Sequence, residues 1–138
     1  MRRLAEAAHP KECCGLLIGR RLEAATQVDE IRPCRNLLDK ECQDRFEIDP
    51  TDRFAAMRQA RAMGREIVGH YHAHPQGPAR PSETDRGMMY EPELIWLIIG
   101  MQKGQVEGIA AFRPNTEAGD FDAVLLVIEA PDDQNSPS

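Results

Sequence analysis

The sequence predicts a single mixed α/β (α+β) domain, in which helices flank a central mixed β-sheet. Short apolar or alternating segments recur along the chain, a few segments with helical spacing lie between them, and no repeat or linker divides the 138 residues. A chain of this length can bury a core of its own. We expect the domain to span residues 1–130 and residues 131–138 to form a disordered polar tail.

The first half of the chain opens with a helical segment and continues with three short strands. The segment RRLAEAAHP has a helical pattern that stops at Pro10. Strands are predicted at CCGLLIG (13–19), TQVDEIRP (26–33) and RFEIDP (45–50). The first is a continuous apolar run bounded by Gly19, which indicates a buried strand. In the third, Phe46 and Ile48 alternate with charged neighbours, as in a half-buried strand.

The next segment, residues 49–64, has helical periodicity. Asp49 or Thr51 can cap its start, and Gly64 can end it. The apolar positions expected to face the core are Phe54, Met57, Ala60 and Met63. Methionine at such positions is typical core filling, so we expect no functional patch on this helix.

The second half of the chain supplies a short helix and four more strands. The strands are predicted at EIVGHYHAH (66–74), ELIWLIIG (93–100), VEGIAAF (106–112) and DAVLLVIE (122–129), the second and third joined around MQKGQ. The loop PQGPARP follows the first of these strands, and the helix begins at Ser82. Strands with only a few helices among them favour the mixed sheet.

The charge pattern and the length of the apolar runs argue against nucleic-acid and membrane partners. The formal net charge is −6 and no window is strongly basic, which argues against nucleic-acid binding. The apolar run LIWLIIG is far too short to span a bilayer. We therefore expect no nucleic-acid or membrane partner, while a homodimer stays open. A cytoplasmic location is expected from the cysteines.

The cysteines indicate reduced thiols rather than a zinc finger or a disulfide framework. No C-x-x-C spacing occurs among Cys13, Cys14, Cys34 and Cys42, and the chain is neither small nor rich in cysteine. We expect Cys14 to pack as a small apolar residue in its strand.

Three of the four histidines stand at alternate positions of one predicted strand, at His70, His72 and His74. Alternate residues share a face of a strand and lie about 7 Å apart, so neighbours can converge on one ion, whereas the outer two are roughly 13 Å apart. Pro75 ends the strand and leaves His74 at an open rim, which favours the pair His72 and His74. A row of solvent-facing histidines is the less favoured interpretation.

Two histidines need a third ligand, because a catalytic zinc ion typically has three protein ligands and an open position. Asp85, in the segment PSETD, can provide it from the first turn of a helix. Ser82 and Asp85 also match the S-x-x-D pattern of a capping box, so the competing interpretation is that Asp85 only caps the helix. Glu83 is the alternative ligand, although it should face a different side of the helix.

A metal-activated water also needs a proton acceptor. Glu12 is the candidate, because it stands just before the apolar strand CCGLLIG and can lie at the edge of a cleft. Spacing alone supports this assignment weakly, since most surface glutamates have no catalytic role.

Together, HPKECCGLLIG, GHYHAHP and PSETD resemble the pattern of the JAMM, or MPN-plus, zinc metalloproteases. That pattern has a glutamate before a C-G-x-L-x-G strand, then H-x-H, then ten residues starting with proline, and then an aspartate with a serine three positions before it. The matching residues are Glu12, His72, His74, Ser82 and Asp85. The stretch from Asn36 to Pro50, N…F-x-I-D-P, is similar to the bacterial single-domain branch, so the resemblance covers almost the whole chain.

The resemblance implies an MPN-like sheet, similar to the cytidine-deaminase sandwich, with one Zn²⁺ per chain. It implies that His72, His74 and Asp85 ligate the metal, that Glu12 is the general base, and that Ser82 hydrogen-bonds the oxyanion. The implied reaction is hydrolysis of the peptide or isopeptide bond after the C-terminal Gly-Gly tail of a ubiquitin-like or sulfur-carrier protein. The long insertions of eukaryotic relatives are missing, so we do not expect linkage-selective cleavage of polyubiquitin.

Other functions are weighed against this one. A non-catalytic scaffold of the MPN type would have lost metal ligands, whereas this chain has all of them. Metal binding without turnover stays open, although the placement of Glu12 and Ser82 argues against it. A zinc nucleobase deaminase needs H-x-E and P-C-x-x-C, and the sequence has neither.

His70 is not a ligand position of the family, and we expect it to support the site or the fold.

Overall fold

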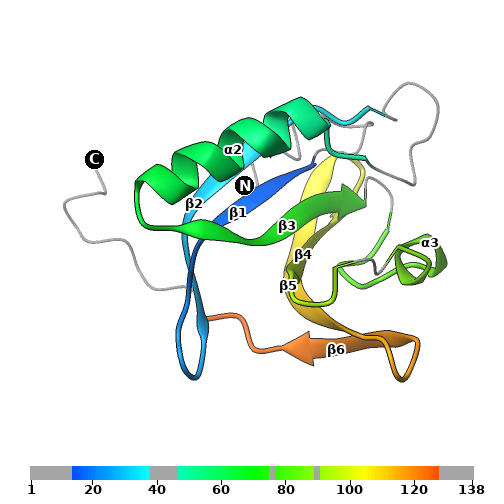
Figure 1. Ribbon diagram of the computed structural model, residues 1–138. Helices are drawn as coiled ribbons and strands as arrows, with labels where there is room; N and C mark the ends of the chain where they lie inside the picture. The colour runs from blue at the N-terminus through cyan, green and yellow to red at the C-terminus, as the bar shows by residue number, and fades with distance from the viewer. Residues whose placement is uncertain (1–13, 38–46, 75–76, 89–90, 128–138) are drawn as a thin grey trace, which may run out of the picture.

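The structure is a computed structural model that describes residues 14–37, 47–74, 77–88 and 91–127. This part of the chain forms one six-stranded sheet in the order β2-β1-β3-β4-β5-β6, accompanied by helices α2 and α3 (Figure 1). The elements are β1 (Cys14–Arg21), β2 (Thr26–Cys34), α2 (Pro50–Ala62), β3 (Glu66–His74), α3 (Glu83–Arg86), β4 (Ile95–Gln102), β5 (Gln105–Asn115) and β6 (Asp120–Val124). The predicted mixed α/β class is confirmed.

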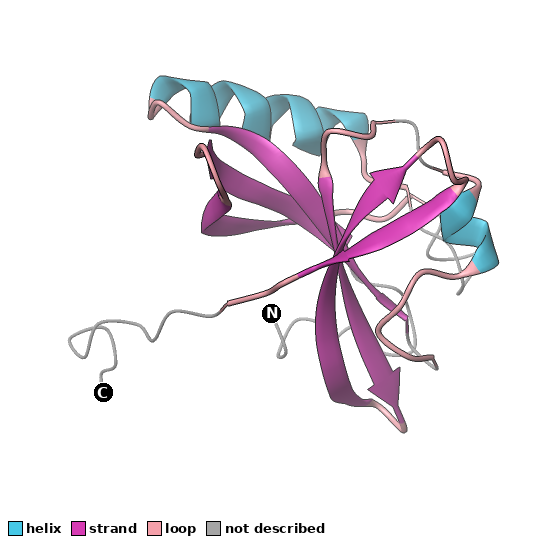
Figure 2. Ribbon diagram, turned by 90° about the horizontal axis from the view of Figure 1, so that it is seen from below, coloured by secondary structure: helices cyan, strands magenta, loops and turns pink. Residues whose placement is uncertain are grey.

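The sheet is mixed because one neighbouring pair of strands is parallel. β3 and β4 run in the same direction, and the other neighbouring pairs are antiparallel. Parallel strands need a crossover connection, which here contains α3. The carboxyl ends of β3 and β4 therefore lie side by side, at the kind of edge where open α/β sheets commonly bind ligands. α2 lies across β1, β2 and β3, and α3 lies apart from it (Figure 2).

Alternation along β3 divides its side chains between the two faces of the sheet. Tyr71 and Ala73 enter the main apolar core on one face, and the three histidines take the alternate positions. That core consists of Leu17, Val68, Tyr71, Ala73, Ile95, Leu97, Ile99, Met101, Val106 and Ala111. Leu16, which is opposite His70 in the pairing of β1 with β3, packs against Ala56 and Ala60 of α2. The helix therefore covers part of the histidine face.

The buried stripe of α2 differs from the prediction. Ala56 and Ala60 are the buried residues, whereas Phe54 is 54% exposed and Met63 is 60% exposed. Two alanines four positions apart share a face and let the helix approach the sheet closely, which leaves larger side chains at its flanks. The Arg58 guanidinium lies over the ring of Phe54, 5.6 Å from its centroid. The predictions of Phe54 and Met63 as core residues are therefore wrong.

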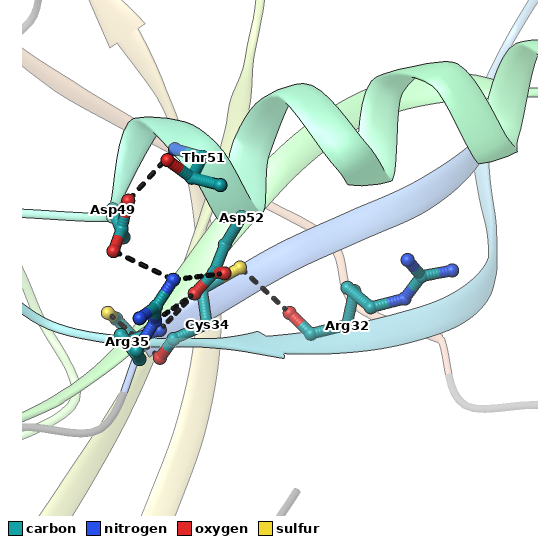
Figure 3. Close-up of polar contacts among 7 residues, drawn as sticks. Arg32, Cys34, Arg35, Asp49, Thr51 and Asp52 are labelled. Atoms are coloured by element: carbon teal, nitrogen blue, oxygen red, sulfur yellow. Dashed lines mark hydrogen bonds and ion pairs between the residues drawn. The ribbon is translucent and has the colours of Figure 1, made fainter.

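The start of α2 is fixed to the end of β2 by polar contacts (Figure 3). Asp49 is the N-cap, as one of the two predicted alternatives, and its carboxylate accepts a hydrogen bond of 2.8 Å from Thr51 N. Arg35, just after β2, forms ion pairs of 3.0 Å with both Asp49 and Asp52. Gly64 follows the helix with a φ of 73°, a conformation that glycine adopts without strain.

Replacing Asp49 by alanine is expected to lower the free energy of unfolding by about 1 kcal/mol, because the Thr51 N–H loses its cap. Asp49→Asn is the matched control: the amide oxygen can still cap, and only the ion pair with the exposed Arg35 is lost. Urea unfolding followed by circular dichroism compares the two variants. Equal destabilisation by the alanine and asparagine variants would mean that the ion pair, and not the cap, stabilises the start of α2.

Two predicted strands differ in extent from the observed ones. Within the described residues, the segment 45–50 forms only a single bridge, between Ile48 and Asn36, and Pro50 already belongs to α2. β6 ends at Val124, where its pairing with β5 stops at Ala111, and the apolar residues 125–127 that follow are exposed. Apolar composition alone does not extend a strand where the pairing ends.

The remaining strand predictions are confirmed apart from their exact ends. β3 has the predicted bounds, and β1 continues past Gly19 to Arg21. The turn between β4 and β5 has positive φ values at Lys103 and Gly104, 54° and 78°, as a tight two-residue hairpin loop requires. Cys14 is buried in the core, as predicted.

Several predicted features lie outside the described residues. They are the helical segment 2–10, Glu12, Cys13, Cys42 and the tail 131–138. Within the described part of the chain, neither helix is long and apolar enough to cross a membrane.

Candidate metal centre

The end of β3 brings two of the three histidines together. The Nε2 atoms of His72 and His74 are 3.1 Å apart, and the two rings meet edge to face with centroids 4.9 Å apart. His72 is completely buried, and the His74 side chain is 12% exposed. The pair favoured by the sequence pattern is therefore the pair that converges, with His74 on the solvent side.

Asp85 approaches this pair from α3. Its carboxylate lies 3.3 Å from His72 Nε2 through one oxygen and 3.1 Å from His74 Nε2 through the other. The same carboxylate accepts a hydrogen bond of 2.9 Å from Ser82 N, while Ser82 Oγ accepts one of 3.1 Å from Asp85 N. This reciprocal pair is a capping box. The two interpretations of Asp85, cap and ligand candidate, are therefore compatible, because the cap holds the carboxylate against the histidines.

The three side chains have the spacing and chemistry of a metal site. His72, His74 and Asp85 each offer one ligand atom, all within 4.8 Å of one another. Ligands about 2.0–2.2 Å from one tetrahedral zinc ion are roughly 3.3 Å apart. The two ring nitrogens are 3.1 Å apart, and each lies 3.1–3.3 Å from the nearer oxygen of the Asp85 carboxylate, which is close to that value. Two imidazole nitrogens and a carboxylate oxygen are also a donor set that zinc accepts.

The electrostatics of Asp85 and His72 favour the protonation states of metal ligands, whereas those of His74 favour the protonated ring. Burial would raise the pKa of Asp85, but hydrogen bonds from His72 and His74 outweigh it and hold that pKa below its usual value. Burial lowers the pKa of His72, against the opposing attraction of Asp85. For His74 burial also acts to lower the pKa, but contact with Asp85 outweighs it and the pKa is raised. An ionised carboxylate and a neutral His72 are the forms that bind a cation.

His70 and Glu83, the other candidates considered, do not join the cluster. The ring of His70 instead meets Trp96 edge to face, with centroids 4.6 Å apart. Burial lowers the pKa of His70 to about 3, so this ring is neutral at physiological pH. Glu83 is exposed on α3. The proposed base, Glu12, lies outside the described residues.

Sequence reasoning missed two neighbours of the cluster. Trp96, opposite His70 in the pairing of β3 with β4, also lies against His72 with ring centroids 5.6 Å apart. Its only sequence signal was its place in an apolar strand. The carbonyl oxygen of Pro78 lies 3.0 Å from His74 Nδ1, and no side-chain pattern reveals a backbone partner.

This chain is similar to a known protein family and to two desampylases. The family described as prokaryotic homologs of the JAB domain matches residues 1–115. The chain is 34% identical to a desampylase of Pyrococcus furiosus over 94 residues and 33% identical to a desampylase of Haloferax volcanii over 89 residues. These matches cover 68% and 64% of this chain and 62% of each relative.

A third relative carries a different name. Tail tip assembly protein K of Escherichia phage N15 is 30% identical over 105 residues, which are 76% of this chain and 39% of the phage protein. The chain therefore spans less than two thirds of the length of these three relatives.

Solved structures share the fold. The solution structure of a protein from Desulfitobacterium hafniense has a TM-score of 0.81 at 28% identity, covering 100% of this chain and 92% of that one. A protein from Salinibacter ruber follows with a TM-score of 0.71 at 28% identity, covering 95% and 87%. A JAB1/MPN domain protein from Archaeoglobus fulgidus has a TM-score of 0.54 at 20% identity, covering 92% and 86%, and supports the likeness of fold alone.

Proposed function

This chain belongs to the family of prokaryotic homologs of the JAB domain, and from that premise we propose that it is a zinc-dependent metallopeptidase. The proposed reaction is hydrolysis of the peptide or isopeptide bond after the C-terminal Gly-Gly tail of a ubiquitin-like or sulfur-carrier protein. The observation that carries the proposal is the cluster of His72, His74 and Asp85 at the carboxyl ends of two parallel strands.

These three residues would hold one zinc ion. When bound, zinc supplies a Lewis acid that polarises a carbonyl group and lowers the pKa of a water molecule. His74 is the partly exposed member of the cluster, so the substrate would enter from its side. His72 and Asp85 are buried and would fix the position of the site.

Ser82 would stabilise the negative charge that develops on the carbonyl oxygen of the substrate. In the capping box its Oγ accepts a hydrogen bond from Asp85 N. A hydroxyl group that accepts one hydrogen bond retains its own O–H as a donor. The cap would thus hold Ser82 beside the cluster without using the hydrogen that an oxyanion needs.

Glu12 would take the proton from the attacking water. It stands two positions before Cys14, and Cys14 is directly opposite His72 in the pairing of β1 with β3. Two residues of chain reach at most about 7 Å, so this spacing is compatible with a role of Glu12 at the same site. We propose Glu12 as the base on this proximity and on its match to the family motif.

The substrate class is supported by the relatives. Two are named desampylases. A non-catalytic metal-binding or scaffold role is the second candidate, since the phage relative is named for tail tip assembly. Turnover distinguishes the two: a metallopeptidase should cleave a carrier conjugate, stop when a chelator removes the metal, and resume when zinc is returned.

Glu12→Gln is expected to retain zinc and bind the carrier tail but to cleave it about a hundredfold or more slowly. Glutamine has nearly the same shape as glutamate but cannot accept the proton. The measurement is single-turnover cleavage of a carrier conjugate by the zinc-loaded protein, with Glu83→Gln as the matched control. If Glu83→Gln is inactive and Glu12→Gln cleaves like the wild type, the base is Glu83.

A further inference from the structure

Gly100 interrupts an otherwise apolar run in β4. It is directly opposite His74 in the parallel pairing of β3 with β4, so its missing side chain would lie beside the His74 ring. A Cβ atom built there would lie 2.8 Å from Pro78 C and closer still to Ala79 N. Both are backbone atoms of the loop between His74 and Ser82. Glycine within a strand commonly marks such a close approach of another backbone.

The loop that occupies this space also contacts the His74 ring. The Pro78 carbonyl oxygen lies 3.0 Å from His74 Nδ1. A carbonyl oxygen can only accept, so Nδ1 carries the hydrogen and donates it. One residue earlier, the Gly77 carbonyl accepts a hydrogen bond of 3.0 Å from Met101 N. The loop therefore packs against β4 at Gly100 and is hydrogen-bonded to it at Met101.

We propose that Gly100 is a positioning residue for His74, acting through the Pro78 carbonyl. The absence of a side chain at position 100 lets the Pro78–Ala79 peptide lie against β4, and from there Pro78 fixes the ring. The hydrogen bond to Pro78 orients the ring so that Nε2 faces His72 and Asp85, where it would ligate the metal. The inference rests on the proposed function in that it takes His74 to be a metal ligand.

The chain offers a matched control on the next strand. Gly108 of β5 is opposite Gly100 in the sheet, and a Cβ atom there would lie 3.8 Å from the Ala79 side chain, an ordinary contact. Alanine at position 108 adds the same methyl group to the same part of the sheet without entering the loop. The two variants therefore differ in whether the Pro78–Ala79 peptide must move.

Gly100→Ala is expected to bind zinc about tenfold to a hundredfold more weakly than the wild type, the range typical for loss of the partner that orients a ligand. Gly108→Ala should stay close to the wild type. Competition with a chromophoric chelator measures both affinities, and the absorption spectrum of the Co²⁺ form reports any change in the ligand geometry. Equal zinc affinities and equal Co²⁺ spectra for the two variants would overturn the proposal.

The His74 ring can also be followed without metal. Long-range ¹H–¹⁵N spectra of the metal-free wild type should show an Nδ1 hydrogen of His74 that exchanges slowly with solvent, because it is donated to the Pro78 carbonyl, and Gly108→Ala should show the same. In folded Gly100→Ala this hydrogen should exchange as fast as that of an exposed imidazole. A wild-type ring whose Nδ1 carries no protected hydrogen overturns the inference even if Gly100→Ala does not fold. If the wild type has the expected ring state but binds no zinc, the proposed function fails and the positioning of His74 stands.

Discussion

Replacement of His72 by alanine is expected to remove the metal. Wild-type protein purified without a chelator should contain about one zinc ion per chain, because the described residues offer one group of three suitable ligands. His72 is completely buried, and its Nε2 is 3.1 Å from His74 and 3.3 Å from Asp85. Without it, two ligands remain, and we expect the zinc affinity to fall by at least roughly a hundredfold. The proposed peptidase activity should fall with it.

His70→Ala is the matched control for this variant. It removes the same ring from the same face of β3, but from a position that contacts Trp96 instead of the cluster. The control should retain zinc, with at most a loss of stability. Trp96 is the only tryptophan in the chain and lies against His72, so quenching of its fluorescence by Co²⁺ reports metal binding directly. Loss of metal from His70→Ala with retention in His72→Ala would mean that the ligand pair is wrong.

Ser82→Ala is expected to reduce turnover by about a hundredfold to a thousandfold if Ser82 donates to the oxyanion. The structure shows that Ser82 also caps α3, so the variant should in addition lose about 1 kcal/mol of stability. The Asp85 carboxylate still accepts from the backbone N–H of residue 82 and should remain in place. Zinc content should therefore change little while cleavage falls.

Two measurements separate the roles of Ser82. Single-turnover cleavage by the zinc-loaded variant reports the donor, and urea unfolding reports the cap. Ser82→Thr keeps a hydroxyl group that can both cap and donate, and it should retain most of the stability and most of the activity. An alanine variant that is less stable but cleaves like the wild type would show that Ser82 is only a cap.

Much of the fold followed from local patterns. The alternation that predicted β3 and the S-x-x-D pattern that predicted the start of α3 depend on residues a few positions apart, and both are present in the structure. The errors arose where contacts between residues far apart in the sequence determine burial or the end of a strand. The exposure of Phe54 follows from the packing of Ala56 and Ala60 on β1, and the end of β6 at Val124 follows from its pairing with β5.

Local sequence patterns were enough to predict that His72 and His74 share a strand face, that Ser82 and Asp85 can form a capping box, and that these residues match a metallopeptidase motif. The contact of the capping carboxylate of Asp85 with the two rings could not be predicted in this way and comes from the three-dimensional fold. The same holds for the contact of the Pro78 carbonyl oxygen with His74, beside Gly100. Periodicity and capping are short-range, whereas these contacts depend on the parallel pairing of β3 with β4 and on the loop that packs where a side chain is missing.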